Sequence, residues 1–344
     1  MSVGKITVEK FLELGRSIPV CDVRSPSEFA SGHIPGAINI PLFDDHERAA
    51  VGTAYKKKGR IPAILEGLRL SGPSMSDKLS IALSEAKEGR LLVHCWRGGM
   101  RSEAMAWLFS LGDLKTEILE GGYKAYRNYI LQDLGVRRKM IVLGGLTGSS
   151  KTHILRYLQG AGEQVVDLEK LANHKGSAFG ALGEPPQPST EHYANLLYNE
   201  LSGLDQTNRF WIEDESRNIG TVFLPEIFYS NMQEAPAVIL MMDMKLRLPR
   251  LISEYSVYPK EALAASIKRI SKRLGGDNTK DALLAIENDD FAAAIEITLR
   301  YYDKAYQHGL KRKNTGKIAI VETDTDDVAE NAMKVLDAAG ILTW

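Results

Sequence analysis

The chain has 344 residues, a length typical of two domains, and carries a formal net charge of −1 at pH 7. Hydrophobic residues make up 44% and charged residues 25%, which favours a globular protein with substantial cores. Two cysteines exclude a disulfide framework, and no apolar run reaches the roughly 18 residues of a membrane span. Because the start also lacks a secretory apolar stretch, we expect a cytoplasmic protein that engages no membrane.

The near-zero net charge gives no overall sign of a polyanionic partner, but basic residues form local runs. These runs lie at residues 56–60, 137–139, 268–273 and 311–313. A one-sided basic patch can bind nucleic acid even on a neutral protein, whereas a single run is more often a solvated helix face.

Residues 1–136 alternate short apolar strands with helical segments and form the predicted first domain. The expected strands lie at residues 19–23, 36–41, 91–94 and 116–119, and a helical turn begins at Pro26. Strands interleaved with helices predict a mainly parallel sheet covered on both faces. Such folds place their chemistry at the carboxyl ends of the strands.

Residues 137–344 repeat this alternation and form the predicted second domain. Strands are expected at 140–143, 164–168, 210–213, 237–241 and 318–321, helices at 153–158 and 328–339, and a helical tract from about 245 to 308. The predicted fold class is therefore α/β, with two successive parallel-sheet domains and a helical C-terminal region.

A cysteine lies where a strand gives way to a helix, within the sequence HCWRGGMRS at residues 94–102. This geometry directs backbone N–H groups and the positive end of the helix at the sulfur atom. Both favour the thiolate, which is the nucleophilic form of cysteine. We therefore predict that Cys95 is a catalytic nucleophile in a loop that also binds anions.

The residues around this nucleophile divide into catalytic candidates and structural ones. Arg97 and Arg101 lie within reach of the loop, and the Cys-x5-Arg spacing suits a bidentate grip by Arg101 on an oxyanion. His94 precedes the cysteine, but adjacent side chains of a strand point to opposite faces, so we expect a buried structural histidine. Cys21 lies inside an apolar strand and is expected to be a small core residue.

The run GLTGSSKT at residues 145–152 approaches the phosphate-loop pattern G-x-x-x-x-G-K-[ST] and lies between a strand and a helix. In that pattern the glycines let the backbone wrap a phosphate, the lysine reaches the outer phosphates, and the hydroxyl holds Mg²⁺. Ser150 stands where the second glycine of the pattern belongs. The predicted phosphate-binding residues here are Gly145, Thr147, Gly148, Ser149, Ser150, Lys151 and Thr152.

Carboxylates follow a neighbouring apolar strand of the same predicted domain. Asp214 suits a group that coordinates metal or orders water opposite Lys151, although Glu213 and Glu215 leave the assignment open by one place. Arg217 could supply positive charge to a transferring group, and its alternative is a surface ion pair. We include Asp214 and Arg217 in the predicted phosphate site and assign no resident metal.

Several motifs resemble known families. Asp22-Val23-Arg24, Glu28-Phe29 and residues 32–37, together with residues 95–102, resemble the signature of a rhodanese domain. Residues 45–56, 173–180 and 213–217 are similar to stretches of the tRNA 2-selenouridine synthases, and this resemblance covers nearly the whole chain. It implies a rhodanese-like three-layer domain at 1–136, followed at 137–344 by a P-loop NTPase-like domain.

The resemblance also implies a reaction. The family replaces sulfur by selenium in 2-thiouridine at the tRNA wobble position, with selenophosphate as selenium donor and an S-geranylated intermediate made from geranyl diphosphate. Cys95 would match the essential cysteine, which is proposed to carry selenium as a selanyl group. The implied partners are this tRNA, the two small-molecule substrates and an enzyme that supplies selenophosphate. No tightly bound cofactor is implied, and Mg²⁺ is the ion that the phosphate loop would suit.

The residues themselves leave three other activities open. A phosphatase could use the Cys-x5-Arg spacing, and a rhodanese-type sulfurtransferase could load sulfur on Cys95 and use ATP at the nucleotide-binding domain. A non-enzymatic, nucleotide-gated binding module would catalyse neither phosphate-ester hydrolysis nor sulfur transfer. Dependence on ATP rather than on geranyl diphosphate distinguishes the sulfurtransferase, and hydrolysis of a phosphate ester distinguishes the phosphatase.

Overall fold

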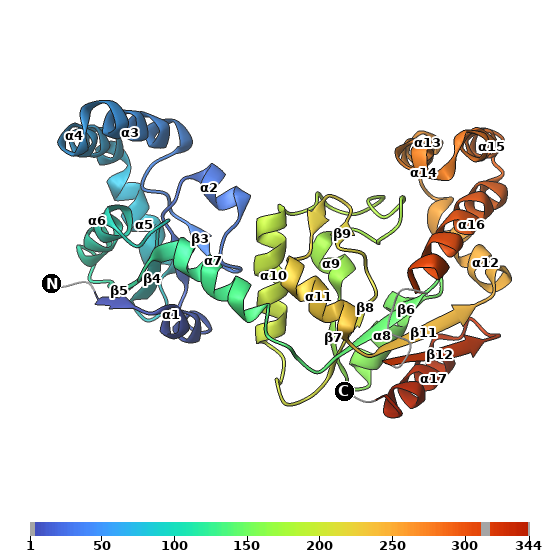
Figure 1. Ribbon diagram of the computed structural model, residues 1–344. Helices are drawn as coiled ribbons and strands as arrows, with labels where there is room; N and C mark the ends of the chain where they lie inside the picture. Colours follow the sequence, from blue (N-terminus) through green and yellow to red (C-terminus); the bar gives the residue numbers. More distant parts are fainter. Residues whose placement is uncertain (1–3, 311–316, 343–344) are drawn as a thin grey trace. The chain divides into compact units, whose positions relative to one another are not determined.

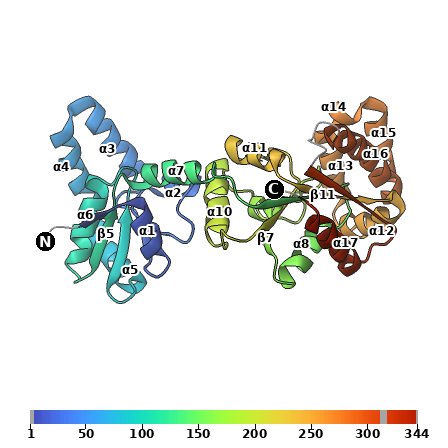
Figure 2. The same cartoon turned by 60° about the horizontal axis from the view of Figure 1, so that its bottom comes forward.

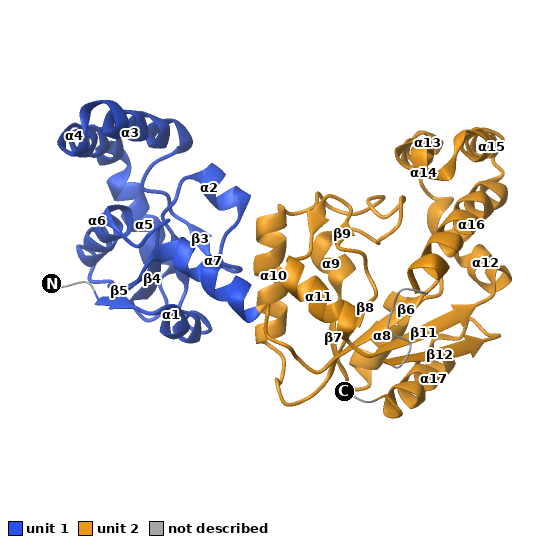
Figure 3. Cartoon of the chain, in the orientation of Figure 1, with its two compact units in different colours: residues 1–133 blue, residues 134–344 orange. Residues whose placement is uncertain are grey.

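The computed structural model describes residues 4–310 and 317–342, so the basic run at 311–313 lies outside the described residues. The ribbon in Figure 1 follows the chain through two compact units, which Figure 3 colours separately. The first unit comprises residues 1–133 and the second residues 134–344. Each unit contains its own five-stranded sheet.

The first unit is built on a parallel sheet with the strand order β1-β5-β4-β2-β3. In chain order its strands are β1 (Gly4–Ile6), β2 (Val20–Asp22), β3 (Ile38–Asn39), β4 (Arg90–His94) and β5 (Lys115–Leu119). Its helices are α1 (Val8–Gly15), α2 (Pro26–Ser31), α3 (Asp45–Lys58), α4 (Arg60–Ser71), α5 (Met75–Glu85), α6 (Met100–Ser110) and α7 (Gly122–Asp133), and η1 (Gly72–Ser74) is a 3-10 turn.

Side-chain alternation along β4 explains why this sheet carries helices on both faces. Leu91 and Val93 pack in one buried cluster with Met105 of α6 and Ala82 of α5. His94 points the other way, where its ring contacts the rings of Phe11 on α1 and Tyr123 on α7. The result is the three-layer arrangement that the sequence predicts.

Helices α3 and α4 form a hairpin that the sequence analysis did not predict. Figures 1 and 2 show the two helices side by side and set apart from the strands of the first sheet. Asp44 caps α3 through a reciprocal pairing with Glu47, and Gly59 turns the chain between the helices at φ 89°. Several large apolar side chains of the hairpin remain exposed, among them Tyr55 and Leu68.

The second unit is built on a parallel sheet with the strand order β12-β11-β6-β8-β7. The strands are β6 (Met140–Gly145), β7 (Gln164–Val166), β8 (Phe210–Glu213), β11 (Ala237–Met242) and β12 (Ile318–Thr323), and a separate antiparallel pair is formed by β9 (Asn218–Ile219) and β10 (Val222–Phe223). Strands β6, β8 and β11 are almost wholly buried, which explains their continuous apolar sequences.

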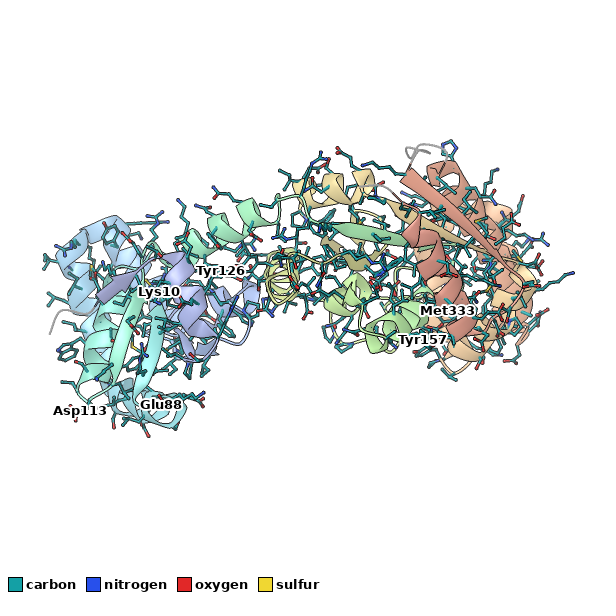
Figure 4. All side chains as sticks on the ribbon, turned by 90° about the horizontal axis from the view of Figure 1, so that it is seen from below. Lys10, Glu88, Asp113, Tyr126, Tyr157 and Met333 are labelled. Carbon is teal, nitrogen blue, oxygen red and sulfur yellow. The ribbon has the colours of Figure 1, made fainter. Side chains whose placement is uncertain are left out.

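Helices of the second unit complete the α/β fold. They are α8 (Lys151–Gly160), α9 (Leu168–Ala172), α10 (Thr190–Ser202), α11 (Glu226–Glu234), α12 (Met244–Tyr255), α13 (Lys260–Arg269), α14 (Ser271–Leu274), α15 (Gly276–Glu287), α16 (Phe291–Leu310) and α17 (Val328–Gly340). Helices α8 and α17 share one core with the strands, and Figure 4 shows Tyr157 and Met333 at the surface of this pair. Helices α12 to α16 form the predicted helical region around a second core.

The predicted fold class, two parallel-sheet α/β domains with a helical C-terminal region, is thus confirmed. Across residues 4–310 and 317–342, no helix combines the length and the apolar character that crossing a membrane requires.

Candidate functional site

The loop at residues 95–99, called the cysteine loop below, joins β4 to α6 and rests on the start of α7. The backbone N–H of Tyr123 donates to the carbonyl of Cys95 at 2.8 Å, and that of Lys124 donates to the carbonyl of Trp96 at 3.0 Å. Gly122 has φ +62°, and a Cβ on it would overlap the Cys95 carbonyl. The carbonyls of Cys95 and Trp96 are therefore bound on the α7 side, while N–H groups of the loop face the sulfur.

Cys95 is buried, with 3% of its surface exposed, and its Sγ lies 3.4 Å from Ser102 Oγ. Burial opposes the thiolate, but hydrogen bonds from the Ser102 hydroxyl and from the backbone N–H groups of Arg97, Ser102 and Gly99 outweigh it. The pKa of Cys95 is consequently lowered from its ordinary value. These donors form an anion cradle around a nucleophilic sulfur.

The two arginines predicted for this site lie in different surroundings. Arg97 is exposed and contributes its backbone N–H to the sulfur. Arg101, on the first turn of α6, donates from Nη1 to Glu28 Oε2 at 2.6 Å and from Nη2 to Glu28 Oε1 at 3.3 Å. Arg48 lies 3.6 Å from the same carboxylate. The sequence predicts that Arg101 binds an oxyanion with two hydrogen bonds. In the structure both of these hydrogen bonds go to the carboxylate of Glu28, which holds Arg101 beside the cysteine loop.

A buried polar group supports the strand ends beneath the cysteine loop. Arg24 is 1% exposed and binds Asp22 through Nε and Nη2, the shortest contact being 2.6 Å. Its guanidinium carbon also lies 3.8 Å from the ring centre of Tyr123. His94 Nε2 is 3.7 Å from Asp22, but burial lowers the pKa of His94, so the imidazole is neutral and structural as predicted. Cys21 is likewise a fully buried core residue.

The phosphate loop, residues 145–152, connects β6 to α8 in a conformation that depends on positive φ angles. Gly145 has φ 151°, Gly148 has φ 83° and Ser150 has φ 65° with ψ 22°. Ser150 thus adopts the left-handed conformation that the usual glycine provides without strain. Ser150 also places a buried hydroxyl in the loop.

Polar groups converge on this loop from several sides. Ser149 and Ser150 have buried hydroxyls without a hydrogen-bond partner in the part of the chain that the structure describes. Lys151 Nζ reaches back to the carbonyl of Gly145 at 3.0 Å. The carbonyl of Thr147 accepts a hydrogen bond of 2.8 Å from Arg247, whose guanidinium also binds Asp303 at 2.6 Å. Buried donors and a lysine on a wound loop are the features that bind phosphate groups.

Two carboxyl groups lie beside Lys151 and Thr152. Thr152 Oγ1 donates to Glu169 Oε2 at 3.0 Å. Burial and the neighbouring charge of Glu169 raise the pKa of Glu215 to about 8, and burial raises the pKa of Glu169. Both carboxyl groups face Gly176, where an added Cβ would lie 2.7 Å from an oxygen of each. Burial and the closeness of the two carboxyl groups therefore both favour their protonated forms.

The remaining predicted residues of this site have other contacts. Asp214 Oδ2 accepts a hydrogen bond of 3.1 Å from the hydroxyl of Tyr306 on α16. Arg217 forms an ion pair of 2.5 Å with Glu226 and is about half exposed. Glu213 is fully buried and accepts a hydrogen bond of 2.7 Å from the backbone N–H of Leu168.

Comparisons with known proteins match the two units separately. A family model described as a rhodanese-like domain matches residues 7–129, and one described as the tRNA 2-selenouridine synthase AAA domain matches residues 138–338. The chain belongs to the tRNA 2-selenouridine synthase family. The tRNA 2-selenouridine synthase of Bordetella petrii is 36% identical, over 87% of this chain and 88% of that protein. Those of a Sulfurovum species and Bdellovibrio bacteriovorus are 36% and 33% identical, over 86% and 91% of this chain and 89% and 95% of theirs.

In this member of the tRNA 2-selenouridine synthase family, the rhodanese-like match contains the cysteine loop and the AAA match contains the phosphate loop. Sequence reasoning missed Ser102, Glu28, Glu169 and Tyr306. Glu28 belongs to the motif that carried the rhodanese resemblance, so its presence was a usable signal. Glu169 and Tyr306 give no local signal, because the fold brings them in from distant segments.

Proposed function

We propose that this chain is a tRNA-modifying transferase that replaces sulfur by selenium in 2-thiouridine at the tRNA wobble position. The observation that carries the proposal is the low-pKa Cys95 thiol in its anion cradle, in one chain with a phosphate loop. Family membership supports it, because relatives that match most of the chain are named tRNA 2-selenouridine synthases. An enzyme that supplies selenophosphate would be the upstream partner.

The first unit would handle selenium. Selenophosphate is an anion, and the N–H groups of Arg97, Gly99 and Ser102 offer the donors that such an anion needs next to a nucleophilic sulfur. The exposed guanidinium of Arg97 adds positive charge at the same loop. Arg101, held by Glu28, would contribute its charge from the first turn of α6.

The second unit would bind geranyl diphosphate. A departing diphosphate needs N–H donors and positive charge, which residues 145–152 and Lys151 supply. The buried hydroxyls of Ser149 and Ser150 can donate to phosphate oxygens in the same loop. Mg²⁺ prefers oxygen ligands and is commonly bound by one or two carboxylates together with substrate phosphates. The carboxyl groups of Glu169 and Glu215 and the hydroxyl of Thr152 would hold this ion. When bound, Mg²⁺ would neutralise charge on the diphosphate.

The proposed order is geranylation first and selenation second. Sulfur of 2-thiouridine displaces diphosphate from the geranyl carbon, which converts a poor leaving group into an alkylated sulfur. In the second step the C2–S bond breaks and a C2–Se bond forms. Geranylthiol leaves, and water takes the phosphoryl group of selenophosphate to give phosphate, so the net exchange requires no oxidant or reductant.

Two variants test this division of labour. Cys95→Ser should retain geranylation of 2-thiouridine tRNA and lose selenation, whereas Lys151→Ala should slow geranyl transfer. Cys21→Ala and Lys170→Ala are the matched controls, because Cys21 is a core thiol and Lys170 is an exposed lysine of α9. Loss of both activities in folded Cys95→Ser would refute the division. An unchanged rate for Lys151→Ala would refute the role of the phosphate loop, and dependence on ATP alone would favour the sulfurtransferase.

A further inference from the structure

The α3–α4 hairpin of the first unit lines one side of an open apolar cavity of about 440 Å³, and residues of α6 line another. Its walls include Leu42, Phe43, Val51, Ala63, Ile64 and Met75. The volume lies within the range of about 300–1,000 Å³ that is usual for small-molecule sites. A cavity of this lining accepts a hydrocarbon group more readily than a polar one.

Every charged side chain that lines the cavity is basic. These residues are Arg48, Lys56, Arg60 and Arg101. Arg48 and Arg101 share Glu28, whereas Lys56 and Arg60 have no ion-pair partner among residues 4–310 and 317–342. Lys56 and Arg60 are also exposed to solvent. The occupant that this combination favours has an apolar part and carries negative charge nearby.

The cavity adjoins the cysteine loop through the first turn of α6. Met100, Arg101 and Ala104 of this helix line the cavity. Ser102, the next residue after Arg101, lies against the sulfur of Cys95. The cavity and the cysteine loop therefore share the first turn of α6, with Arg101 on the cavity side and the adjacent Ser102 against the sulfur.

We propose that this cavity binds the geranyl chain of the S-geranylated nucleoside while the nucleoside C2 atom faces the cysteine loop, an inference that rests on the proposed function. The apolar walls bind the terpenyl chain, and the basic rim contacts the tRNA phosphates that flank the nucleoside. The occupant is the tRNA-bound intermediate rather than free geranyl diphosphate, because the residues suited to a diphosphate lie in the other unit. The geranyl group would thus also be a group that the enzyme recognises during the selenation step.

Steady-state selenation of two RNAs tests the proposal. One anticodon stem-loop carries S-geranyl-2-thiouridine and the other S-methyl-2-thiouridine, each with saturating selenophosphate. The parent enzyme should have a KM for the S-geranyl RNA lower by about tenfold or more, because burial of the longer apolar group strengthens binding. Ile64→Trp, which fills the cavity, should raise that KM about tenfold and leave the S-methyl KM unchanged.

Neighbouring residues supply the controls. Leu65→Trp lies one position along α4 at an exposed site outside the cavity lining, so it should alter neither KM. Ala104→Phe, at an exposed position of the cavity mouth, should reproduce the Ile64→Trp effect without disturbing the core. Lys56→Glu should weaken binding of both RNAs more than Lys57→Glu, because only Lys56 lines the cavity. Equal effects of the two lysine variants would contradict the assignment of the rim.

The outcomes separate this inference from the proposed function. No selenation of either RNA by the parent enzyme would refute the proposed function itself. Selenation with equal KM values for the two RNAs, unaltered by Ile64→Trp and Ala104→Phe, would overturn only the geranyl site. A change of oligomeric state in sedimentation with Ile64→Trp, at unaltered KM, would overturn it in favour of a second copy of the chain on this surface.

Discussion

Replacing Ser102 by alanine should raise the pKa of Cys95 by a defined and modest amount. Ser102 Oγ lies 3.4 Å from Cys95 Sγ and 2.9 Å from the carbonyl oxygen of Gly99. The hydroxyl has one proton, so it can donate to only one of these acceptors at a time. It donates to the sulfur when Cys95 is a thiolate and to Gly99 when Cys95 is a thiol.

The magnitude follows from the difference between these two states. A hydrogen bond to a charged group contributes about 1.5–3 kcal/mol, and the carbonyl bond that is given up contributes about 1 kcal/mol. The sulfur contact is long, so the lower end applies and the net stabilisation of the thiolate is about 0.5 kcal/mol. At about 1.4 kcal/mol for each pKa unit, Ser102→Ala should raise the pKa of Cys95 by about 0.4 unit.

The pH dependence of alkylation by iodoacetamide measures this pKa directly. Cys21 does not interfere, because it is fully buried and burial raises the pKa of its thiol. Ser110→Ala is the matched control, since Ser110 lies on the same helix and bonds the carbonyl of Trp107 at 2.6 Å, far along α6 from the sulfur. An unchanged midpoint in Ser102→Ala, or an equal shift in Ser110→Ala, would show that the Ser102 hydroxyl does not stabilise the thiolate.

Two further predictions concern the second unit. The pKa of Glu215 is raised to about 8, so the neutral form stabilises the fold at low pH and this stabilisation is lost as pH rises from about 5 to about 8. Glu215→Gln should flatten this decline in the thermal unfolding temperature, and parallel curves for the two proteins would contradict the assignment. Ser150→Gly should raise the free energy of unfolding by about 1 kcal/mol. The glycine removes the left-handed backbone strain and the buried unpartnered hydroxyl, and these two gains exceed the cost of the greater chain entropy of glycine in the unfolded state. Destabilisation measured by denaturant titration would show that the hydroxyl has a structural partner.

Much of the fold could be predicted because its strands are buried on both faces. Short continuous apolar runs flanked by glycine or turn residues favour a buried strand over a buried helix. Leu91–Val93 and Met140–Leu143 are two such runs. The two loops at the carboxyl ends of β4 and β6 follow from the same pattern. The sequence therefore predicts where Cys95 and Lys151 lie on their sheets.

Other features depend on packing that no local pattern records. The α3 sequence is rich in charge and buries no residue fully, so its apolar face is too weak to predict a hairpin. The sequence pattern favours Asp214 as the carboxylate opposite Lys151 and leaves Glu213 and Glu215 as alternatives. In the structure Thr152 donates to Glu169, and the charge of Lys151 acts on both Glu169 and Glu215. Glu169 comes from α9, so only tertiary structure places it beside the phosphate loop.

Mass spectrometry of nucleosides from 2-thiouridine tRNA tests the central claim most directly. The tRNA is incubated with the folded protein and geranyl diphosphate, with and without selenophosphate. The account predicts S-geranylated 2-thiouridine in the first mixture and its conversion to 2-selenouridine in the second. Unmodified 2-thiouridine in both mixtures would contradict the proposed function.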